Sequence, residues 1–171
     1  MTNQISQRAT HPAADEELLK LEDFLPYRIN VCAHVVSQAL SRIYTDRYKI
    51  GVPEWRILVT LGQFGKMTAK DIGRHSHMHK TKVSRAVAML ERRKLVTRRA
   101  NRADLREVFL SLTPAGQAAY DELTPAAIAF AKELLDTVEP TDRAPLERAL
   151  KKLTERSAQL AAGLANERTS R

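Results

Sequence analysis

Residues 67–113 read MTAKDIGRHSHMHKTKVSRAVAMLERRKLVTRRANRADLREVFLSLT, and this stretch decides the fold. It begins with a helix start signal, because the Thr68 hydroxyl can cap a helix while Asp71, three residues later, reaches back as in a capping box. The pattern predicts a short helix over about residues 68–75. The turn HSHMH follows it, so this helix ends before the next begins.

A second short helix is predicted from about Lys80 to Arg93. Its apolar residues recur at helical spacing and form one buried stripe: Val83, Val87 and Leu90, with Ala86 beside them. Its opposite face is polar and basic in the N-terminal half: Lys80, Thr81, Lys82, Ser84, Arg85 and Ala88. Two short helices joined by a tight turn, the second one basic, are typical of a helix-turn-helix.

After Lys94 the periodicity changes from helix to strand. The segments LVTRR (95–99) and VFLSL (108–112) alternate in the manner of two strands, and the polar residues between them predict the tip of a hairpin. Thr113-Pro114 then starts a new helix, with Thr113 as the cap and Pro114 as the first helical residue. We therefore expect a winged helix-turn-helix.

Long helices are predicted on both sides of this stretch. An apolar run with spacings of three and four begins near Glu16 and ends near Tyr48, and Pro26 either kinks this helix or starts a fresh one. A further helix starts at Pro53, and two more occupy about residues 114–138, with a possible bend at Pro125, and 141–164. The predicted organisation is a disordered tail (1–15), an N-terminal dimerisation helix region (16–52), the winged helix-turn-helix (53–113), C-terminal dimerisation helices (114–165) and a frayed tail (166–171).

Charge is concentrated in the same central stretch. Residues 66–106 hold thirteen Lys or Arg and three Asp or Glu, whereas the chain as a whole has a net charge of +8. A positive field inside a nearly neutral frame predicts a polyanionic partner. No apolar run is long enough to span a membrane, the N-terminus has no signal-peptide pattern, and the single cysteine fits a reducing compartment, so we expect a cytoplasmic protein.

The order of elements resembles that of the MarR family of transcription regulators. TKVSRAVAMLERRKLVTR (81–98) is similar to the family's recognition helix and first wing strand, and Asp104-Leu105-Arg106 with Leu112-Thr113-Pro114-Ala115-Gly116 is similar to its wing signature D-x-R…L-T-x-x-G. The resemblance covers about residues 20–160. It implies a mainly α fold, a homodimer joined by the terminal helices and a palindromic site on double-stranded DNA. One departure is the HSHMH turn, which stands where the family usually has an Asp, Ser or Thr cap.

In the recognition helix, residues 80–85 are expected to face DNA in the major groove. Arg85 is the first candidate for a bidentate guanine contact, and Lys80, Lys82, Thr81 and Ser84 are expected to bind bases or phosphates. Lys70 is expected to bind phosphate, as is one of the strand pair Arg98 and Arg99, of which we choose Arg98. For each of these residues the alternative is a solvated surface position. The resemblance implies that an arginine of the wing, Arg102 or Arg106, enters the minor groove and that Asp104 fixes the wing's shape.

The resemblance also implies a small-molecule pocket lined by the first, second and fifth helices. Its candidate residues are Tyr27, Arg28, His34, Trp55 and Phe64. A basic group beside aromatic rings suits an aromatic carboxylate or an acyl thioester of coenzyme A. Each candidate has a simpler alternative, such as an ion pair of Arg28 with Glu22 or Asp23, packing of His34 at an interface, or a place in the core for Trp55.

Two other sensing modes are open. Peroxide-sensing relatives carry a cysteine near the start of the first helix, where this chain has Pro26, and Cys32 lies almost two turns later on the apolar stripe. A metal would draw on His75, His77 and His79, but no acidic or cysteine residues nearby complete a site, so we expect no resident metal or other cofactor.

The classes of function follow from these patterns. A ligand-responsive repressor is the main hypothesis, and an architectural DNA binder without an effector is the alternative. The sequence contains no P-loop, Rossmann glycine pattern, nucleophile elbow or metal-hydrolase motif, and we expect that the protein is not an enzyme.

Overall fold

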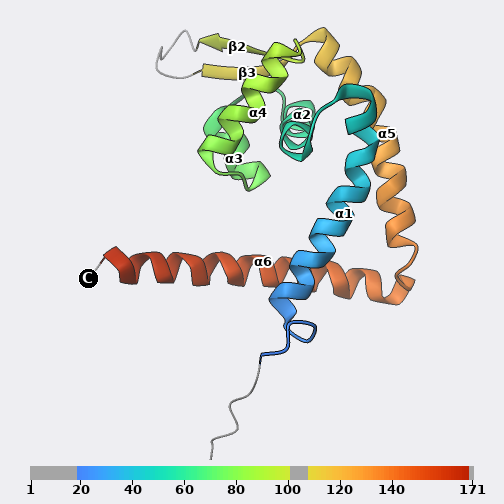
Figure 1. Ribbon diagram of the computed structural model, residues 1–171, viewed down its shortest axis with the longest axis vertical. Helices are drawn as coiled ribbons and strands as arrows, with labels where there is room; N and C mark the ends of the chain where they lie inside the picture. Colours follow the sequence, from blue (N-terminus) through green and yellow to red (C-terminus); the bar gives the residue numbers. More distant parts are fainter. Residues whose placement is uncertain (1–18, 101–107, 170–171) are drawn as a thin grey trace, which may run out of the picture. The chain divides into compact units, whose positions relative to one another are not determined.

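The computed structural model describes residues 19–100 and 108–169, with side chains as far as Leu164. Its elements, in chain order, are α1 (Leu25–Tyr48), α2 (Val52–Phe64), β1 (Met67–Thr68), α3 (Ala69–Ser76), α4 (Lys80–Arg92), β2 (Val96–Ala100), β3 (Val108–Leu112), α5 (Pro114–Leu135) and α6 (Pro140–Thr169) (Figure 1). The chain divides into two compact units, residues 1–39 and residues 40–171. The predicted mainly α fold with a small β wing is confirmed.

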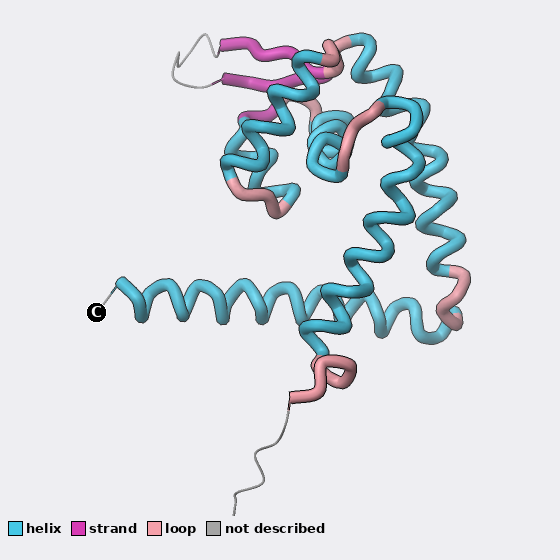
Figure 2. Tube along the Cα trace, viewed as in Figure 1, coloured by secondary structure: helices cyan, strands magenta, loops and turns pink. Residues whose placement is uncertain are grey.

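The sheet joins the wing to the helix-turn-helix. Its strand order is β1-β3-β2, and both pairings are antiparallel. The wing hairpin pairs Val96 with Leu112 at one end and Ala100 with Val108 at the other. The two-residue strand β1, which the sequence did not predict, pairs Met67 with Leu110 and leads directly into α3 (Figure 2). The start of the helix-turn-helix is thereby hydrogen-bonded to the wing.

The core of the second unit is built from the apolar stripes of α2, α3, α4 and the strands. Ile57, Leu58, Ile72 and Leu90 are completely buried, and the stripe of Val83, Ala86, Val87 and Leu90 predicted for α4 is confirmed. The close approach of α5 to the end of this core depends on Gly116, because a Cβ there would overlap the backbone carbonyl of Leu95. Such an overlap has no flexible side chain to absorb it.

The cap of α5 is the one predicted. The Thr113 hydroxyl accepts a hydrogen bond from the Gly116 amide at 3.0 Å, and Pro114 follows it as the first helical residue. The same hydroxyl donates to the Lys94 carbonyl at 2.6 Å. Thr113, which follows β3, is therefore hydrogen-bonded to a residue just beyond the end of α4.

The end of α1 is anchored within the second unit. Tyr44 is buried and stacks on Trp55 with ring centroids 5.0 Å apart, so Trp55 occupies the place in the core that was the simpler alternative for it. The Tyr48 hydroxyl donates to Glu122 at 2.7 Å, and Arg47 forms an ion pair with the same carboxylate at 2.6 Å. Burial raises the pKa of Tyr44, and burial together with the Glu122 bond raises the pKa of Tyr48.

The first unit contains the beginning of α1. This helix starts at Leu25, so Pro26 lies in its first turn, where a missing N–H costs nothing, as the second alternative for Pro26 predicted. The predicted helical run from about Glu16 is wrong at its beginning, because residues 21–23 form a turn. Every described side chain from Leu19 to Val35 is exposed. The exposed set includes several large apolar residues: Leu19, Leu21, Phe24, Leu25, Tyr27, Ile29, Val31 and Val35.

Apolar side chains are also exposed on the C-terminal helices, which belong to the second unit. α5 contains Pro125, and α6 runs for 30 residues. Every described side chain from Ala144 to Leu164 is exposed. The apolar stripe predicted for this helix is present but uncovered: Leu146, Leu150, Leu153, Leu160 and Leu164. None of the helices in the described part of the chain is both long and apolar enough to cross a membrane.

Candidate nucleic-acid interface

The first helix of the helix-turn-helix is capped as predicted. The Thr68 side chain accepts a hydrogen bond from the Asp71 amide at 3.2 Å. The capping-box partner behaves differently from the expectation, since the Asp71 carboxylate accepts the Thr68 hydroxyl at 2.7 Å. The two side chains hold each other in place, and Lys70 stands exposed between them.

The HSHMH turn, unexplained by the sequence, is a defined connection. His77 ends α3 in the left-handed conformation (φ 51°), and the Met78 amide donates to the Gly73 carbonyl at 3.0 Å. Met78 is buried in the core. A Cβ on Gly73 would lie 3.1 Å from the Met78 carbonyl oxygen, so the small residue at this position allows the tight turn.

His79 takes the capping position that Asp, Ser or Thr would usually fill. It is the N-cap of α4, and its Nδ1 accepts a hydrogen bond from the Thr81 amide at 3.5 Å. Its backbone carbonyl accepts from the amides of Lys82 and Val83. A neutral imidazole nitrogen can act as an acceptor, so the departure from the usual cap leaves the start of the helix intact.

The remaining histidine of the turn packs on an aromatic ring. His75 and Phe64 have ring centroids 4.6 Å apart, and the Arg56 guanidinium donates to the Ser76 carbonyl at 3.4 Å. The three histidines therefore serve three different local contacts. Within residues 19–100 and 108–164, no group of three or more His, Cys, Asp or Glu side chains is placed to hold a metal ion.

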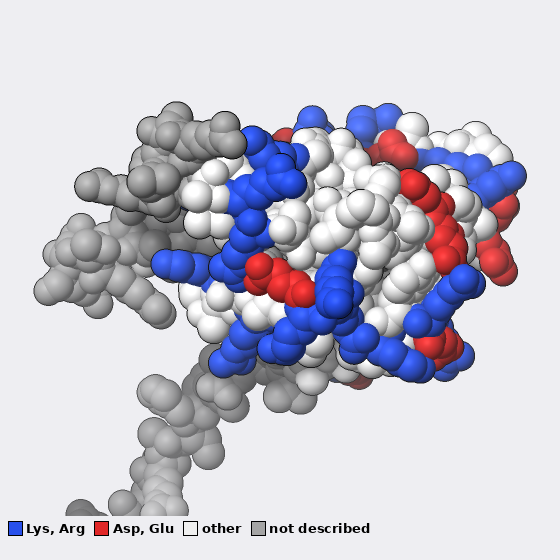
Figure 3. All heavy atoms as spheres, turned by 90° about the horizontal axis from the view of Figure 1, so that it is seen from above, with Lys and Arg blue, Asp and Glu red and all other residues white. Residues whose placement is uncertain are grey.

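Basic side chains cover the outside of this lobe. All the Lys and Arg side chains described between residues 66 and 100 are exposed: Lys66, Lys70, Arg74, Lys80, Lys82, Arg85, Arg92, Arg93, Lys94, Arg98 and Arg99. Figure 3 shows basic groups spread over this face of the molecule, with acidic groups lying among them and more of the acidic groups toward the right of the view. The resulting surface suits the phosphate backbone of a nucleic acid.

The predicted recognition residues stand together on α4. Its inward face is buried, and the outward face presents Lys80, Thr81, Lys82, Ser84 and Arg85 to solvent. Among the described residues, none of these five side chains forms a hydrogen bond or an ion pair within the protein. The predicted wing residues Arg102, Asp104 and Arg106 lie outside the described residues.

Arg98, one of the predicted DNA contacts, also forms a bond within the protein that was not predicted. Its Nε donates to Glu91 Oε1 of α4 at 2.7 Å, as an ion pair between helix and wing. Glu91 is one of only three acidic residues between positions 66 and 106, and no role for it was predicted from the sequence. Its spacing of seven residues from Arg98 across a change from helix to strand carries no pattern that would have shown the pair.

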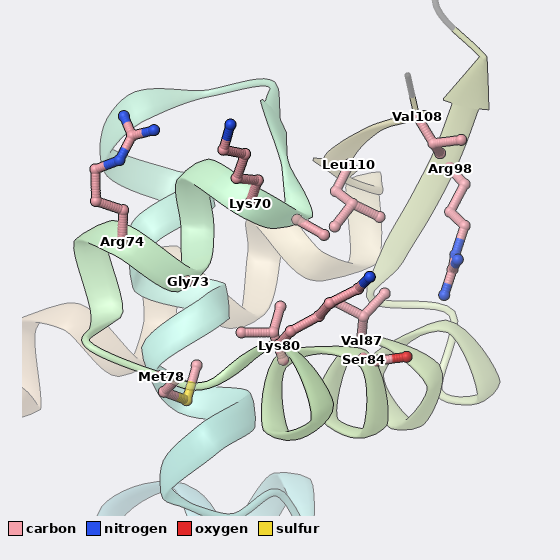
Figure 4. Close-up of a pocket in the computed structure, with 12 residues that line it drawn as sticks. Lys70, Gly73, Arg74, Met78, Lys80, Ser84, Val87, Arg98, Val108 and Leu110 are labelled. Carbon is pink, nitrogen blue, oxygen red and sulfur yellow. The ribbon is translucent and has the colours of Figure 1, made fainter. Parts of the chain in front are cut away.

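A cavity of about 580 Å³ opens on the same face. Its apolar residues come from α3, α4 and the wing, and its polar rim is largely basic: Ala69, Gly73, Met78, Val83, Val87, Val108 and Leu110 with Lys70, Arg74, Lys80, Ser84 and Arg98 (Figure 4). No pattern in the sequence indicates this cavity, because its lining comes from segments about 40 residues apart that only the fold brings together.

The predicted effector residues have several different environments. Tyr27, Arg28 and His34 are exposed on α1 in the first unit. In the second unit, Trp55 lies in the core and Phe64 contacts the His75 ring in a tilted arrangement. The cavity described above includes none of them.

Comparisons with known proteins agree with this geometry. Residues 50–108 match the model of the MarR family, and no curated protein matches the sequence. A MarR/EmrR family transcriptional regulator from Acinetobacter sp. ADP1 is 29% identical, with a TM-score of 0.75 over 82% of this chain and 99% of that one. The MarR family regulator SPO1453 from Silicibacter pomeroyi DSS-3 is 28% identical, with a TM-score of 0.69 over 80% of this chain and 97% of that one.

A more distant structure shares the fold. BpsR from Bordetella bronchiseptica, whose DNA binding is regulated by 6-hydroxynicotinic acid, is 19% identical, with a TM-score of 0.73 over 80% of this chain and 97% of that one. The resemblance to the MarR family that the wing and recognition helix predicted is therefore confirmed. With it, the coarser part of the predicted function is confirmed, that of a DNA-binding transcriptional regulator.

Proposed function

We propose, on the premise that this chain is a DNA-binding transcriptional regulator of the MarR type, that it is a homodimeric repressor released from a palindromic operator by a small anionic molecule. The observation that carries the proposal is the outward face of α4. Five polar or basic side chains of its N-terminal half are exposed, while its other face is locked into the core. A helix held in this way can enter the major groove without rearranging the lobe.

In the complex, each part of the lobe would have its own role. Arg85 donates two hydrogen bonds to a guanine, and Thr81 and Ser84 contact neighbouring bases. Lys70 and Lys80 neutralise phosphates. Arg102 or Arg106 enters the adjacent minor groove, where a narrow A·T-rich sequence concentrates negative potential. The lobe would thus recognise one half of the operator.

The second half requires a second copy of the chain. Two surfaces are available for pairing, each described by itself: the exposed apolar stripe of α6, and the exposed apolar residues of the segment from Leu19 to Val35. An apolar stripe this long on a helix is stable in water when another helix covers it. In a two-fold dimer the two recognition helices would lie about one helical turn of DNA apart, roughly 34–36 Å.

The effector is proposed to be an amphipathic anion, such as an aromatic carboxylate or an acyl thioester of coenzyme A. The cavity beside α4 supports this chemistry, since an apolar floor takes the ring or acyl chain and a basic rim takes the charge. Because Lys70, Lys80 and Ser84 are also proposed DNA contacts, an occupant there would compete with DNA directly. The alternative location is the pocket predicted around Tyr27 and Arg28.

The test is a titration of the protein with the DNA upstream of its own coding region. We expect one high-affinity palindromic site whose affinity falls steeply with salt, and release by at least one member of a panel of aromatic acids and their thioesters. Uniform affinity for all duplexes would instead indicate an architectural DNA binder. An effector that acts equally on Lys80→Gln and on the wild type would place its site away from the cavity.

A further inference from the structure

The wing and the recognition helix are joined by one charged contact. Glu91 lies in the last turn of α4, and Arg98 lies in the middle of β2. The Arg98 Nε–H donates to Glu91 Oε1 at 2.7 Å, and the two side chains are 48% and 30% exposed, respectively. The pair lies at the surface, where an ion pair contributes little to folding. A contribution to folding therefore does not explain why this ion pair lies beside the proposed DNA-binding face.

Among the described residues, the Arg98 side chain bonds only to Glu91, through its Nε atom, which leaves its other donors available. A guanidinium has five N–H donors, and the bond to Glu91 uses the one on Nε. The four donors on the two Nη atoms form a fork that matches a phosphate. Arg98 extends from β2 toward α4 in Figure 4 and lines the same cavity as Lys80 and Ser84. The fork therefore stands beside the recognition face.

The geometry points to Glu91 as a positioning residue that holds Arg98 so that its Nη groups bind a DNA phosphate next to the recognition helix. This inference rests on the proposed function, because it assumes that α4 enters the major groove. A carboxylate on a DNA-facing surface repels the phosphates by itself. Its presence is favourable to binding only where it restricts an arginine that would otherwise lose its side-chain freedom when DNA binds.

The test compares wild type, Glu91→Gln, Arg98→Gln and the double variant. Each is titrated with a 30-base-pair duplex that the wild type selects from a random pool, at several salt concentrations. We expect Arg98→Gln to weaken binding about tenfold and to reduce the slope of log K against log salt by about 0.9, the value for one phosphate contact. Glu91→Gln should weaken binding about threefold when Arg98 is present, as expected for an exposed ion pair.

The decisive comparison is the effect of Glu91→Gln without the arginine. In the Arg98→Gln background the loss of the carboxylate should leave affinity unchanged or raise it slightly, because only its repulsion remains. A merely structural role would lower the melting temperature of both Glu91 variants and leave the salt slope unaltered. That result would overturn the inference.

Two further outcomes also decide against it. If Glu91→Gln strengthens binding more in the presence of Arg98 than in its absence, the carboxylate competes with the phosphate. If the effect is the same in both backgrounds, the two residues act independently. Asp136→Asn is the matched control, since Asp136 pairs with Arg143 at 3.0 Å at the junction of α5 and α6, and it should leave DNA affinity unchanged. A wild type that binds no duplex at low salt overturns the proposed function itself, which separates the two failures.

Discussion

The winged lobe and α6 both carry regularly spaced apolar side chains, but those of the lobe are buried and those of α6 are exposed. In the lobe, apolar side chains at helical spacing are buried, and Leu58, Ile72 and Leu90 are completely inaccessible to solvent. On α6, leucines at equally regular spacing are exposed, and Leu164 is 63% exposed. The apolar side chains of the lobe are buried within one chain, whereas those of α6 are exposed to solvent.

The difference teaches which part of the protein can be stable alone. A stripe that is covered within the chain stabilises the fold at any protein concentration. A stripe that is covered only by a partner makes stability depend on concentration. Mutations in the two regions should therefore differ in the kind of effect as well as in its size.

The largest effect is expected in the lobe. Leu90→Ala removes a completely buried side chain from α4 and should lower the free energy of unfolding by about 2–5 kcal/mol, because the rigid surroundings close the cavity only in part. Urea unfolding at several protein concentrations measures it. A loss below about 1 kcal/mol, or one that changes with concentration, would break the contrast between lobe and outer helix.

On α6 the corresponding change should act on assembly. Leu150→Lys combined with Leu153→Lys places two charges on the exposed stripe and should weaken the proposed homodimer about a hundredfold or more. Sedimentation velocity detects the dissociation, and circular dichroism should show that the lobe remains folded. Lys152→Ala, on the same helix but outside the stripe, is the control. A dimer that survives the double change would remove α6 from the interface.

Within the lobe, base recognition and phosphate binding can be separated. Arg85→Ala should cost about 1–3 kcal/mol at one operator position and relax its base preference. Lys70→Ala should weaken all sequences alike and reduce the salt slope by about one contact. Binding-site selection from a random pool measures both. Unchanged base preference for Arg85→Ala would remove Arg85 from direct recognition.

A smaller effect is expected at the start of the helix-turn-helix. Thr68→Ala removes the hydroxyl that caps α3 and pairs with Asp71, and it should reduce stability by about 0.5–2 kcal/mol. Thr68→Ser keeps the hydroxyl and is the matched control. Thermal unfolding of the two variants gives the difference, and equal melting temperatures would show that β1 alone fixes this helix start.

The smallest effect concerns alkaline pH. Because the pKa values of Tyr44 and Tyr48 are raised in the folded chain, the folded state holds their protons more tightly than the unfolded state does. Their contribution to stability is complete below the ordinary tyrosine pKa of about 10 and is lost as pH rises through the folded values. Unfolding experiments between neutral pH and pH 11 should show this decline, and a smaller one in Tyr44→Phe. An equal decline in the variant would assign it to other groups.

Much of the architecture followed from the sequence because its signals are local. Thr68 and Thr113 cap helices through contacts made within three residues, and the stripe of α4 depends only on spacing along one helix. The outward orientation of the predicted recognition residues followed for the same reason, since the residues opposite a buried stripe must face outward.

Only the tertiary structure decided what distant segments do together. It paired β1 with the wing and joined Glu91 to Arg98. It also formed a cavity from α3, α4 and the strands, and left the predicted stripe of α6 uncovered. Periodicity along a chain determines which face of an element is apolar, but the partner of that face is set by packing in three dimensions. The sequence therefore determined a helix with a basic outward face on a winged lobe, and the fold decided how its charges are held and which apolar surfaces stay exposed.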